Sequence, residues 1–224
     1  MWQHPWLISP TTAAMPRRHK RNADESHKQK THCPTISLSG SEFFSYDKIS
    51  PKTTMDRKIY LTTYASPCGN LEIGSYDDRL CLCDWTDRRH HAAILNRISK
   101  RLGCRTESGL SDCNEKAIMQ LDDYFSGRRM EFDIPLLFAG TPFQEEVWRH
   151  LLDIPYASTE SYSSLSRRIG NPAAVRAVAN ANGANAISIF VPCHRVIGSD
   201  GTLTGYGGGL PAKRFLLDIE RKHR

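Results

Sequence analysis

Apolar residues recur at regular spacing only after residue 54 of the 224-residue chain, and this boundary limits which part can fold. Residues 1–54 are rich in Ser, Thr, Pro, Lys and His. Such a composition cannot bury enough apolar surface to offset the chain entropy lost on folding. We therefore expect a disordered basic tail over residues 1–54. Met55 directly precedes the first regular segment, which suggests the hypothesis that the functional protein starts there and that the tail is dispensable.

The first folded segments have the spacing of strands, and segments with helical spacing follow them. Turns with Gly, Pro or Asp separate three short apolar runs, a pattern typical of an antiparallel meander. Two amphipathic helices come next. Together these segments predict a small α/β lobe over residues 55–138. The expected strands span residues 59–64, 70–76 and 80–85, and the helical faces carry Ile94, Leu95, Ile98 and Leu102, then Ala117, Ile118, Leu121, Tyr124 and Phe125.

A capping box marks the start of a second lobe, predicted over residues 139–224. Thr141 and Gln144 have the spacing at which each side chain bonds the backbone N–H of the other. Pro142 occupies the first helical position, where no N–H is needed. These signals together predict a helix that begins at Pro142.

Two short helices across a tight turn follow, an arrangement typical of a helix-turn-helix. They are expected over residues 161–169 and 172–182, the second started by an Asn171 cap and a proline. Alternating apolar residues then predict a strand over residues 187–191, and a final helix begins at Pro211. The expected fold class is α+β: the small α/β lobe, then a mainly helical, winged-helix-like DNA-binding domain.

The helix predicted after the turn consists mostly of residues with small side chains. It is rich in alanine, and Arg176 is its only charged residue. Against DNA, small side chains would let the helix approach a groove closely and leave Arg176 to enter the base stack as a wedge. A tightly packed core helix with one arginine reaching the surface explains the same composition. The composition alone leaves both interpretations open.

Cys193 lies between Pro192 and His194 at the end of the expected apolar strand. A free thiol has a pKa of about 8.5, so only a few per cent is thiolate at neutral pH without help. His194 is the obvious base, but neighbours on a strand point to opposite faces, so His194 would act at the strand end or through water. Glu220 on the last helix is a candidate to orient the imidazole. From spacing alone, an inert buried cysteine is the simpler interpretation.

Charge and cysteine usage narrow the class of protein further. The net charge is +6, and residues 1–54 carry +4, residues 141–224 carry +3 and the residues between carry −1. Such an excess suits a polyanion such as DNA, and an ordinary solvated basic surface equally well. Seven cysteines without regular spacing indicate a reducing, cytoplasmic setting with no zinc set. No apolar run is long enough to cross a bilayer. We therefore expect a cytoplasmic protein without a bound metal.

Two motifs in the second lobe resemble those of the O6-alkylguanine-DNA alkyltransferases. They are PCHRVIG at residues 192–198 and GYGGGL at residues 205–210. The resemblance is strongest over residues 141–220, extends weakly to the SPCG turn at residues 66–69 and does not reach residues 1–54. Two positions depart from the family pattern: an alanine follows Tyr156 where glycine is usual, and another follows Asn185 where proline is usual.

The resemblance implies direct repair of double-stranded DNA that contains O6-alkylguanine. The damaged base is flipped out of the duplex, and its methyl or other alkyl group moves irreversibly onto Cys193. No cofactor is implied, and a monomer would act once. The alternative is a non-enzymatic alkyltransferase-like protein that only recognises the lesion, but such proteins lack the cysteine. The range of alkyl groups and activity on O4-alkylthymine stay open.

The resemblance also implies roles for individual residues. Cys193 is the acceptor, His194 its base through water, and Glu220 polarises His194. The further catalytic residues are Asn185, a hinge, and Tyr162, which meets the flipped nucleotide's phosphate. The residues implied at the DNA are Arg176, Tyr162, Ala177 and Arg195, and those implied at the base pocket are Tyr206, Gly207, Gly208 and Val191.

Overall fold

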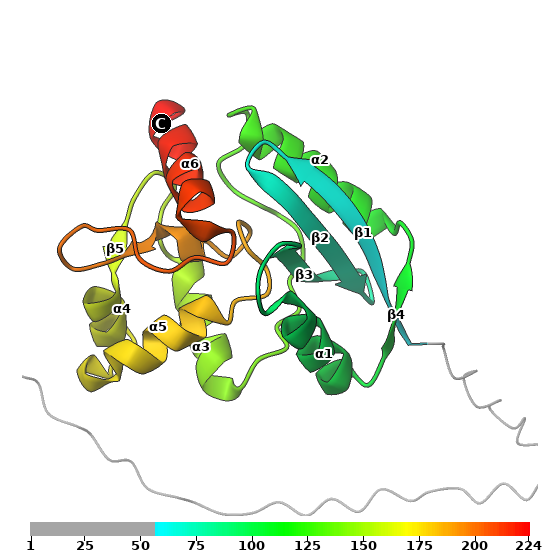
Figure 1. Cartoon of the computed structure of the whole chain (residues 1–224), viewed down its shortest axis with the longest axis horizontal. Helices are drawn as coiled ribbons and strands as arrows, with labels where there is room; N and C mark the ends of the chain where they lie inside the picture. Colours follow the sequence, from blue (N-terminus) through cyan, green and yellow to red (C-terminus); the bar gives the residue numbers. More distant parts are fainter. Residues whose placement is uncertain (1–56) are drawn as a thin grey trace, which may run out of the picture. The chain divides into compact units, whose positions relative to one another are not determined.

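A four-stranded sheet forms the first lobe of the computed structural model, which describes residues 57–224 (Figure 1). The expectations of a disordered tail over residues 1–54 and of a start at Met55 lie outside the described residues. The three predicted strands pair as an antiparallel meander, and a fourth joins its edge in parallel, giving the order β3-β2-β1-β4. The strands are β1 (Lys58–Ser66), β2 (Gly69–Tyr76), β3 (Arg79–Trp85) and β4 (Arg105–Ser108).

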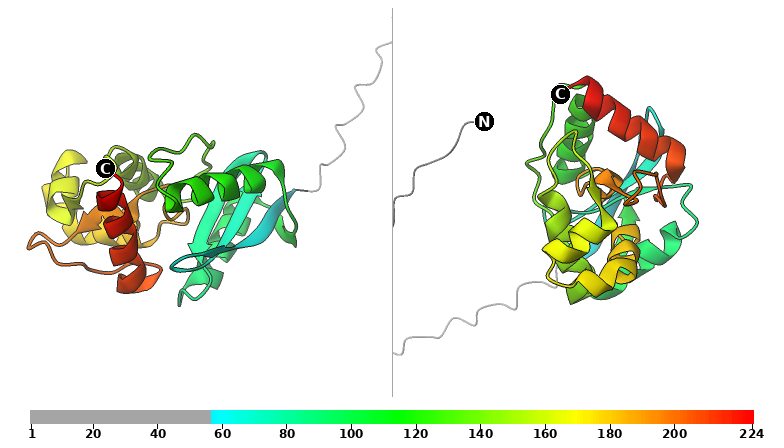
Figure 2. Two further views of the ribbon diagram at one scale, coloured as in Figure 1. Left: turned by 90° about the horizontal axis from the view of Figure 1, so that it is seen from above. Right: turned by 90° about the vertical axis from the view of Figure 1, so that its left-hand side faces the viewer.

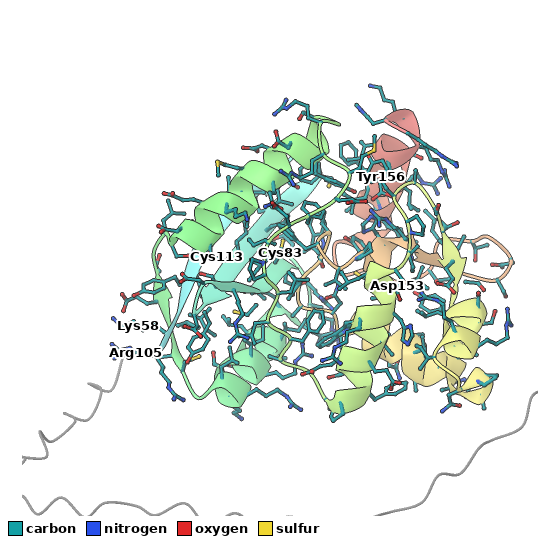
Figure 3. All side chains as sticks on the ribbon, turned by 180° about the vertical axis from the view of Figure 1, so that it is seen from behind. Lys58, Cys83, Arg105, Cys113, Asp153 and Tyr156 are labelled. Atoms are coloured by element: carbon teal, nitrogen blue, oxygen red, sulfur yellow. The ribbon has the colours of Figure 1, made fainter. Side chains whose placement is uncertain are left out.

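The apolar pattern does not predict β4. All four of its residues are polar and exposed, so they show no alternation of apolar and polar side chains. Its place comes from pairing with β1, in which Lys58 lies opposite Arg105 and Leu61 opposite Ser108 (Figure 3). Backbone hydrogen bonding at the sheet edge therefore positions this segment without buried side chains.

Two helices cover the sheet, as the amphipathic spacing predicts. α1 (His91–Leu102) buries Ile94 and Ile98, and α2 (Asp112–Phe125) packs against β1, β2 and β3 (Figure 1). The hydroxyl of Ser111 caps α2 by accepting a backbone N–H of its first turn at 3.1 Å. Each large apolar side chain buried on these faces contributes about 1.5–3 kcal/mol. Core burial therefore holds both helices on the sheet.

The second lobe is mainly helical and contains the predicted helix-turn-helix. Its capping box is formed: Thr141 Oγ1 accepts the N–H of Gln144 at 3.3 Å, and Gln144 Oε1 accepts that of Thr141 at 2.9 Å. Within residues 57–224, no helix is both long and apolar enough to cross a bilayer. The elements are α3 (Pro142–Leu152), β5 (Glu160–Ser161), α4 (Tyr162–Arg168), the 3₁₀ turn η1 (Pro172–Ala174), α5 (Val175–Gly183), the 3₁₀ turn η2 (Cys193–Arg195), β6 (Val196–Ile197) and α6 (Gly209–Lys222).

Two helix starts differ from the expected ones. Residue 172 begins the 3₁₀ turn η1 and not an α-helix, and Asn171, with φ −130° and ψ 77°, makes no side-chain capping bond. The last helix begins at Gly209, before the expected Pro211. A proline in the first turn is accommodated there, because the first N–H groups of a helix have no intrahelical acceptor.

Residues 187–191 form a tight turn, so the prediction of a strand is wrong. The N–H of Val191 donates to the carbonyl of Ile187 at 2.9 Å. Between them, Ile189 lies in the left-handed region with a φ of 74°. Every residue from 185 to 196 is buried. The apolar spacing there reflects burial on all sides and not the two faces of a strand.

β3 joins the two lobes through its backbone. The N–H of Cys83 donates to the carbonyl of Ala186 at 2.8 Å, and its carbonyl accepts the N–H of Ser188 at 2.7 Å. Figure 3 shows Cys83 where the sheet meets this part of the second lobe. The following residues 193–197 lie between α5 and α6 (Figures 1 and 2). The sheet therefore fixes the turn that leads to Cys193.

Candidate active site

Cys193 begins η2 and is almost fully buried, with 5% of its surface exposed. The side-chain amide of Asn185 donates to Cys193 Sγ at 3.1 Å and to the carbonyl of Val191 at 3.0 Å. The amide oxygen of Asn185 accepts the N–H of Ile187 at 2.9 Å. Two backbone groups therefore fix the Asn185 side chain, and that side chain holds the thiol.

His194 and Glu220 are joined directly. His194 Nε2 lies 2.8 Å from Glu220 Oε1, and neither side chain is exposed. The carboxylate, carried by α6, also accepts the Tyr124 hydroxyl at 2.8 Å, the Arg195 guanidinium at 3.0 Å and the N–H of Ala157 at 3.0 Å. A buried carboxylate is tolerated when its oxygens are bonded in this way and a cation is paired with it.

These contacts set the protonation states of the pair. Burial by itself would raise the pKa of Glu220, but the hydrogen bonds and charges of His194 and Arg195 lower it to about 2. Burial, helped by the charges of Arg195 and Lys213, lowers the pKa of His194 below its usual value, although the Glu220 carboxylate acts in the opposite direction. At neutral pH the carboxylate is therefore ionised and the imidazole neutral. Nε2 carries the proton that Glu220 accepts, and Nδ1, which has no hydrogen-bond partner within residues 57–224, is the basic nitrogen.

The thiol itself is held in its protonated form at rest. Burial raises the pKa of Cys193, while the Asn185 hydrogen bond and the charges of Arg88 and Lys213 act in the opposite direction. Asp84 adds a smaller effect that raises the pKa. Because the thiolate is the reactive form, the site needs a base to become nucleophilic. The neutral imidazole of His194 is the candidate for that base.

Lys213 on α6 belongs to the site, although its sequence position does not indicate this. Its ammonium group is fully buried and donates to the carbonyls of Val196 at 2.6 Å and Thr204 at 2.8 Å. Burial lowers the pKa of Lys213 to about 8. A lysine in an amphipathic helix normally lies at the surface, so helical spacing alone does not identify it.

The segment from Tyr206 to Gly208 forms a wall beside the imidazole. The Tyr206 ring contacts His194 and Trp85 edge-on, with ring centroids 6.4 and 5.9 Å apart, and Gly207 follows it half-buried. A Cβ at Gly208 would come within 2.5 Å of the Trp85 ring, so only glycine allows this approach. Trp85 ends β3, where its aromatic side chain indicates only a core position.

Tyr162 lies at the same site, as the first residue of α4. The Ser161 hydroxyl caps this helix and fixes where it begins. Burial raises the pKa of Tyr162, and hydrogen bonds to Thr204 and Asn182 oppose that rise. A negative charge on Cys193 would raise the pKa further. The tyrosine therefore keeps its proton and can act as a hydrogen-bond donor.

The residues implied at the DNA lie in different environments. Arg176 and Ala177 are exposed on α5, and Arg176 makes no ion pair or side-chain hydrogen bond within residues 57–224. Arg195 is only 6% exposed, and its guanidinium donates to Glu220 at 3.0 Å and to the carbonyl of Ile154 at 2.7 Å. The η2 turn directs this side chain inward, and the expectation that Arg195 binds DNA stays a prediction.

Val191, which is expected at the base pocket, is fully buried, and its role there stays a prediction. Its carbonyl accepts the N–H of Cys193 at 2.7 Å and the Asn185 amide at 3.0 Å, so both lone pairs are already used. A cavity of about 420 Å³ lies nearby, lined mainly by apolar side chains together with Pro192 and Arg195. Cys193 does not line this cavity, which is therefore separate from the thiol site.

Two family models match the chain, one in each lobe. The model described as 6-O-methylguanine DNA methyltransferase, ribonuclease-like domain, matches residues 59–138. The model described as 6-O-methylguanine DNA methyltransferase, DNA binding domain, matches residues 142–222.

Similar proteins are known from several bacteria. A Bacillus subtilis (strain 168) relative, named methylated-DNA–protein-cysteine methyltransferase, constitutive, is 42% identical over 168 residues, which cover 72% of this chain and 95% of the relative. A Mycobacterium bovis methylated-DNA–protein-cysteine methyltransferase is 55% identical over 105 residues, or 47% of this chain and 64% of the relative, less than two thirds of its length. The crystal structure of Mycobacterium tuberculosis OGT in complex with DNA has a TM-score of 0.62 at 40% identity, covering 74% of this chain and 94% of that chain.

Proposed function

The chain belongs to the 6-O-methylguanine DNA methyltransferase family, and we propose that it repairs DNA by moving a methyl or other alkyl group from O6-alkylguanine onto Cys193. One observation carries the proposal: a buried thiol held by Asn185 lies beside a neutral His194 whose imidazole is oriented by an ionised Glu220. Nucleophile, base and orienting carboxylate are the parts that thiol chemistry requires. The protein is itself the acceptor, so no cofactor is needed.

The reaction begins with the thiol proton. His194 Nδ1 takes it through a water molecule, and Glu220 stabilises the resulting imidazolium. The Cys193 thiolate then attacks the alkyl carbon in line with guanine O6, so that the S–C bond forms as the C–O6 bond breaks. The electron pair leaves with O6, and guanine gains a proton as it departs. We assign the Tyr162 hydroxyl as the donor, and the proton that His194 took returns through water to the Tyr162 oxygen, so that both side chains end neutral. A thioether does not hydrolyse under mild conditions, so each molecule reacts once.

Base flipping brings the alkyl group to the thiol. Guanine O6 lies within the stacked duplex, and extruding the base costs a few kcal/mol. α5 presents an exposed face of small residues, on which Arg176 has no partner among residues 57–224. We assign Arg176 to the space that the flipped base vacates, with Ala177 against the DNA. Tyr206, Gly207 and Gly208 form the pocket wall that meets the base.

The two lobes have separate tasks in this proposal. Residues 139–224 provide the thiol, its base and the DNA-binding face, and residues 55–138 support them from the sheet. The family matches, which end at residue 138 and resume at residue 142, support this division. Because one chain holds every assigned residue, we propose a monomer that acts on double-stranded DNA in the cytoplasm.

The test is a titration with duplex DNA that carries O6-methylguanine labelled in its methyl group. With DNA in excess, label on the protein should level off at one methyl group per molecule. Cys193→Ala should take up no label and should still bind the alkylated duplex, because neither the α5 helix nor the pocket wall needs the thiol to contact DNA. Repeated turnover, or uptake of label by Cys193→Ala, would overturn the proposal.

A further inference from the structure

Arg88 connects the first lobe to the residue that holds the thiol. It lies in the turn between β3 and α1, and 12% of its side chain is exposed. Its Nη1 donates to Asp84 Oδ1 at 2.7 Å and to the backbone carbonyl of Asn185 at 3.1 Å. Its Nη2 donates to the carbonyl of Gly183. One guanidinium therefore bonds a carboxylate of the first lobe and two carbonyls of the second.

The first lobe fixes Arg88 firmly. Asp84 lies on β3 with a fully buried side chain, and its second oxygen faces His91 Nδ1 at 3.3 Å. The other nitrogen of His91 lies 2.9 Å from Glu72 Oε2 on β2. A planar guanidinium bonded to an anchored carboxylate keeps a set direction, because its donors form a rigid fork.

The carbonyls that Arg88 bonds lie at the end of α5. The last carbonyls of a helix have no intrahelical donor and carry the negative end of its dipole, so an arginine is favoured there. Arg97 of α1 bonds the next carbonyl, that of Ala184, at 2.9 Å. Arg88 differs from Arg97 because it also bonds Asn185, whose side chain holds Cys193 Sγ at 3.1 Å.

Arg88 also lies against the pocket wall. A Cβ added at Gly207 would be 3.1 Å from Arg88 Nη1, so this glycine and the guanidinium are in close contact. The same side chain therefore limits the position of the wall segment and of the Asn185 backbone. Asn185 bonds the thiol, and the wall segment includes Tyr206, whose ring lies beside His194.

We propose that Arg88 is a positioning residue for alkyl transfer: by bonding the Asn185 carbonyl and packing against Gly207, it sets the geometry of the Asn185 hydrogen bond to Cys193 and of the base pocket. The inference rests on the proposed function of Cys193. It gives the first lobe a part in the reaction, exerted through Asn185 and the pocket wall. A residue that acts through another in this way affects rate through small displacements, and a misplacement of about 1 Å can cost on the order of a hundredfold in rate.

The charge of Arg88 adds a second, measurable effect, because it lowers the pKa of Cys193. A positive charge near a thiol favours the thiolate. Removing it should therefore reduce the reactivity of the thiol toward any electrophile. The other titratable or charged groups that act on or adjoin this thiol are Cys83 and Asp84 on β3, Tyr162 on α4, His194 on η2, Tyr206 in the wall and Lys213 on α6.

The experiment measures two rates in full-length wild type, Arg88→Met, Arg88→Lys and the matched control Arg97→Met. One is modification of Cys193 by iodoacetamide against pH, followed by the mass of the Cys193 peptide. The other is methyl transfer from duplex O6-methylguanine. Arg88→Met should shift the modification profile to higher pH and slow transfer about tenfold or more. Arg88→Lys keeps the positive charge but lacks the planar guanidinium with its several donors. It should therefore show the wild-type pH profile of Cys193 modification but a slower methyl transfer than wild type.

Arg97→Met should lose stability through the Ala184 carbonyl and leave both rates near wild type. The proposal would be overturned if Arg88→Met kept the wild-type modification profile and transfer rate. It would also be overturned if Arg97→Met changed both quantities as much as Arg88→Met does. If Arg88→Met does not fold, Arg88→Lys with an unchanged transfer rate would overturn it as well. The iodoacetamide profile needs no DNA, so a wild type that transfers no methyl group would count against the proposed function and still test Arg88.

Discussion

His194 Nε2 lies 2.8 Å from Glu220 Oε1, and solvent reaches neither side chain. The ionised carboxylate accepts the Nε2 proton, which leaves Nδ1 as the only basic nitrogen of the ring. The orientation of the base is therefore set by a residue 26 positions away on the last helix. In the proposed reaction, proton removal from Cys193 then depends on both residues.

Replacing His194 by alanine should slow methyl transfer by about a hundredfold or more, the usual contribution of a general base. Glu220→Ala should also slow it, because the imidazole loses its orientation. The transfer rate of wild type should fall as the pH drops below the pKa of His194, which burial lowers from 6.5. Single-turnover rates between pH 5 and 8 measure this; equal rates in wild type and both variants would mean that another group activates the thiol.

Glu220 should also govern stability in acid. Its pKa falls from 4.5 to about 2 on folding, so its contribution is complete above pH 4.5 and is lost as the pH falls toward 2. A shift of this size corresponds to about 3 kcal/mol. Glu220→Gln should therefore remove much of the decline of unfolding free energy in this range, measured by urea unfolding at several pH values. Asp218→Asn, which breaks an exposed ion pair on the same helix, should leave the decline unchanged.

The order of elements follows from the sequence because each has a local cause. Strand spacing predicts β1 to β3, and the capping box at Thr141 predicts the start of α3. The turn at residues 187–191 is different, because a fully buried segment has apolar residues whatever its backbone does. The polar strand β4 is fixed by pairing with β1 and not by its own side chains.

The sequence predicts only part of the candidate site, because tertiary contacts also decide where its side chains point. The motif around Cys193 predicts the nucleophile and its neighbouring base, but not the direction of each side chain. Arg195 turns inward to Glu220, and Lys213 is buried, although arginine and lysine usually indicate a surface. Arg88 comes from the other lobe, and only the fold brings it to Asn185.

Ala157 offers a stabilising substitution. Its φ of 57° lies in the left-handed region, where a side chain costs roughly 1 kcal/mol and glycine costs nothing. Ala157→Gly should therefore raise the free energy of unfolding by up to about 1 kcal/mol, measured by urea or thermal unfolding. Ile189→Gly relieves similar strain at a φ of 74° but removes a buried side chain, so it should destabilise by a few kcal/mol. A loss of stability in Ala157→Gly would contradict the claim that the backbone is strained at Ala157.

Arg176 should matter only where a base must leave a duplex. Arg176→Ala should lose about tenfold or more of its rate on double-stranded O6-methylguanine DNA, because the flipped state is less populated when nothing fills the vacated stack. Its reaction with free O6-benzylguanine should be nearly unchanged, once wild type is shown to accept that compound. Arg167→Ala, which removes one exposed positive charge from the neighbouring α4, is the matched control. Equal losses of Arg176→Ala on both substrates would assign Arg176 to the fold or the pocket.

The most direct measurement is the site of the transferred group. Wild type is incubated with duplex DNA that carries O6-methylguanine, digested and analysed by peptide mass. We expect one added methyl group on the Cys193 peptide and none on the peptides of the other six cysteines. Methyl found on a more accessible thiol such as Cys68 or Cys104, or on no cysteine at all, would contradict Cys193 as the acceptor.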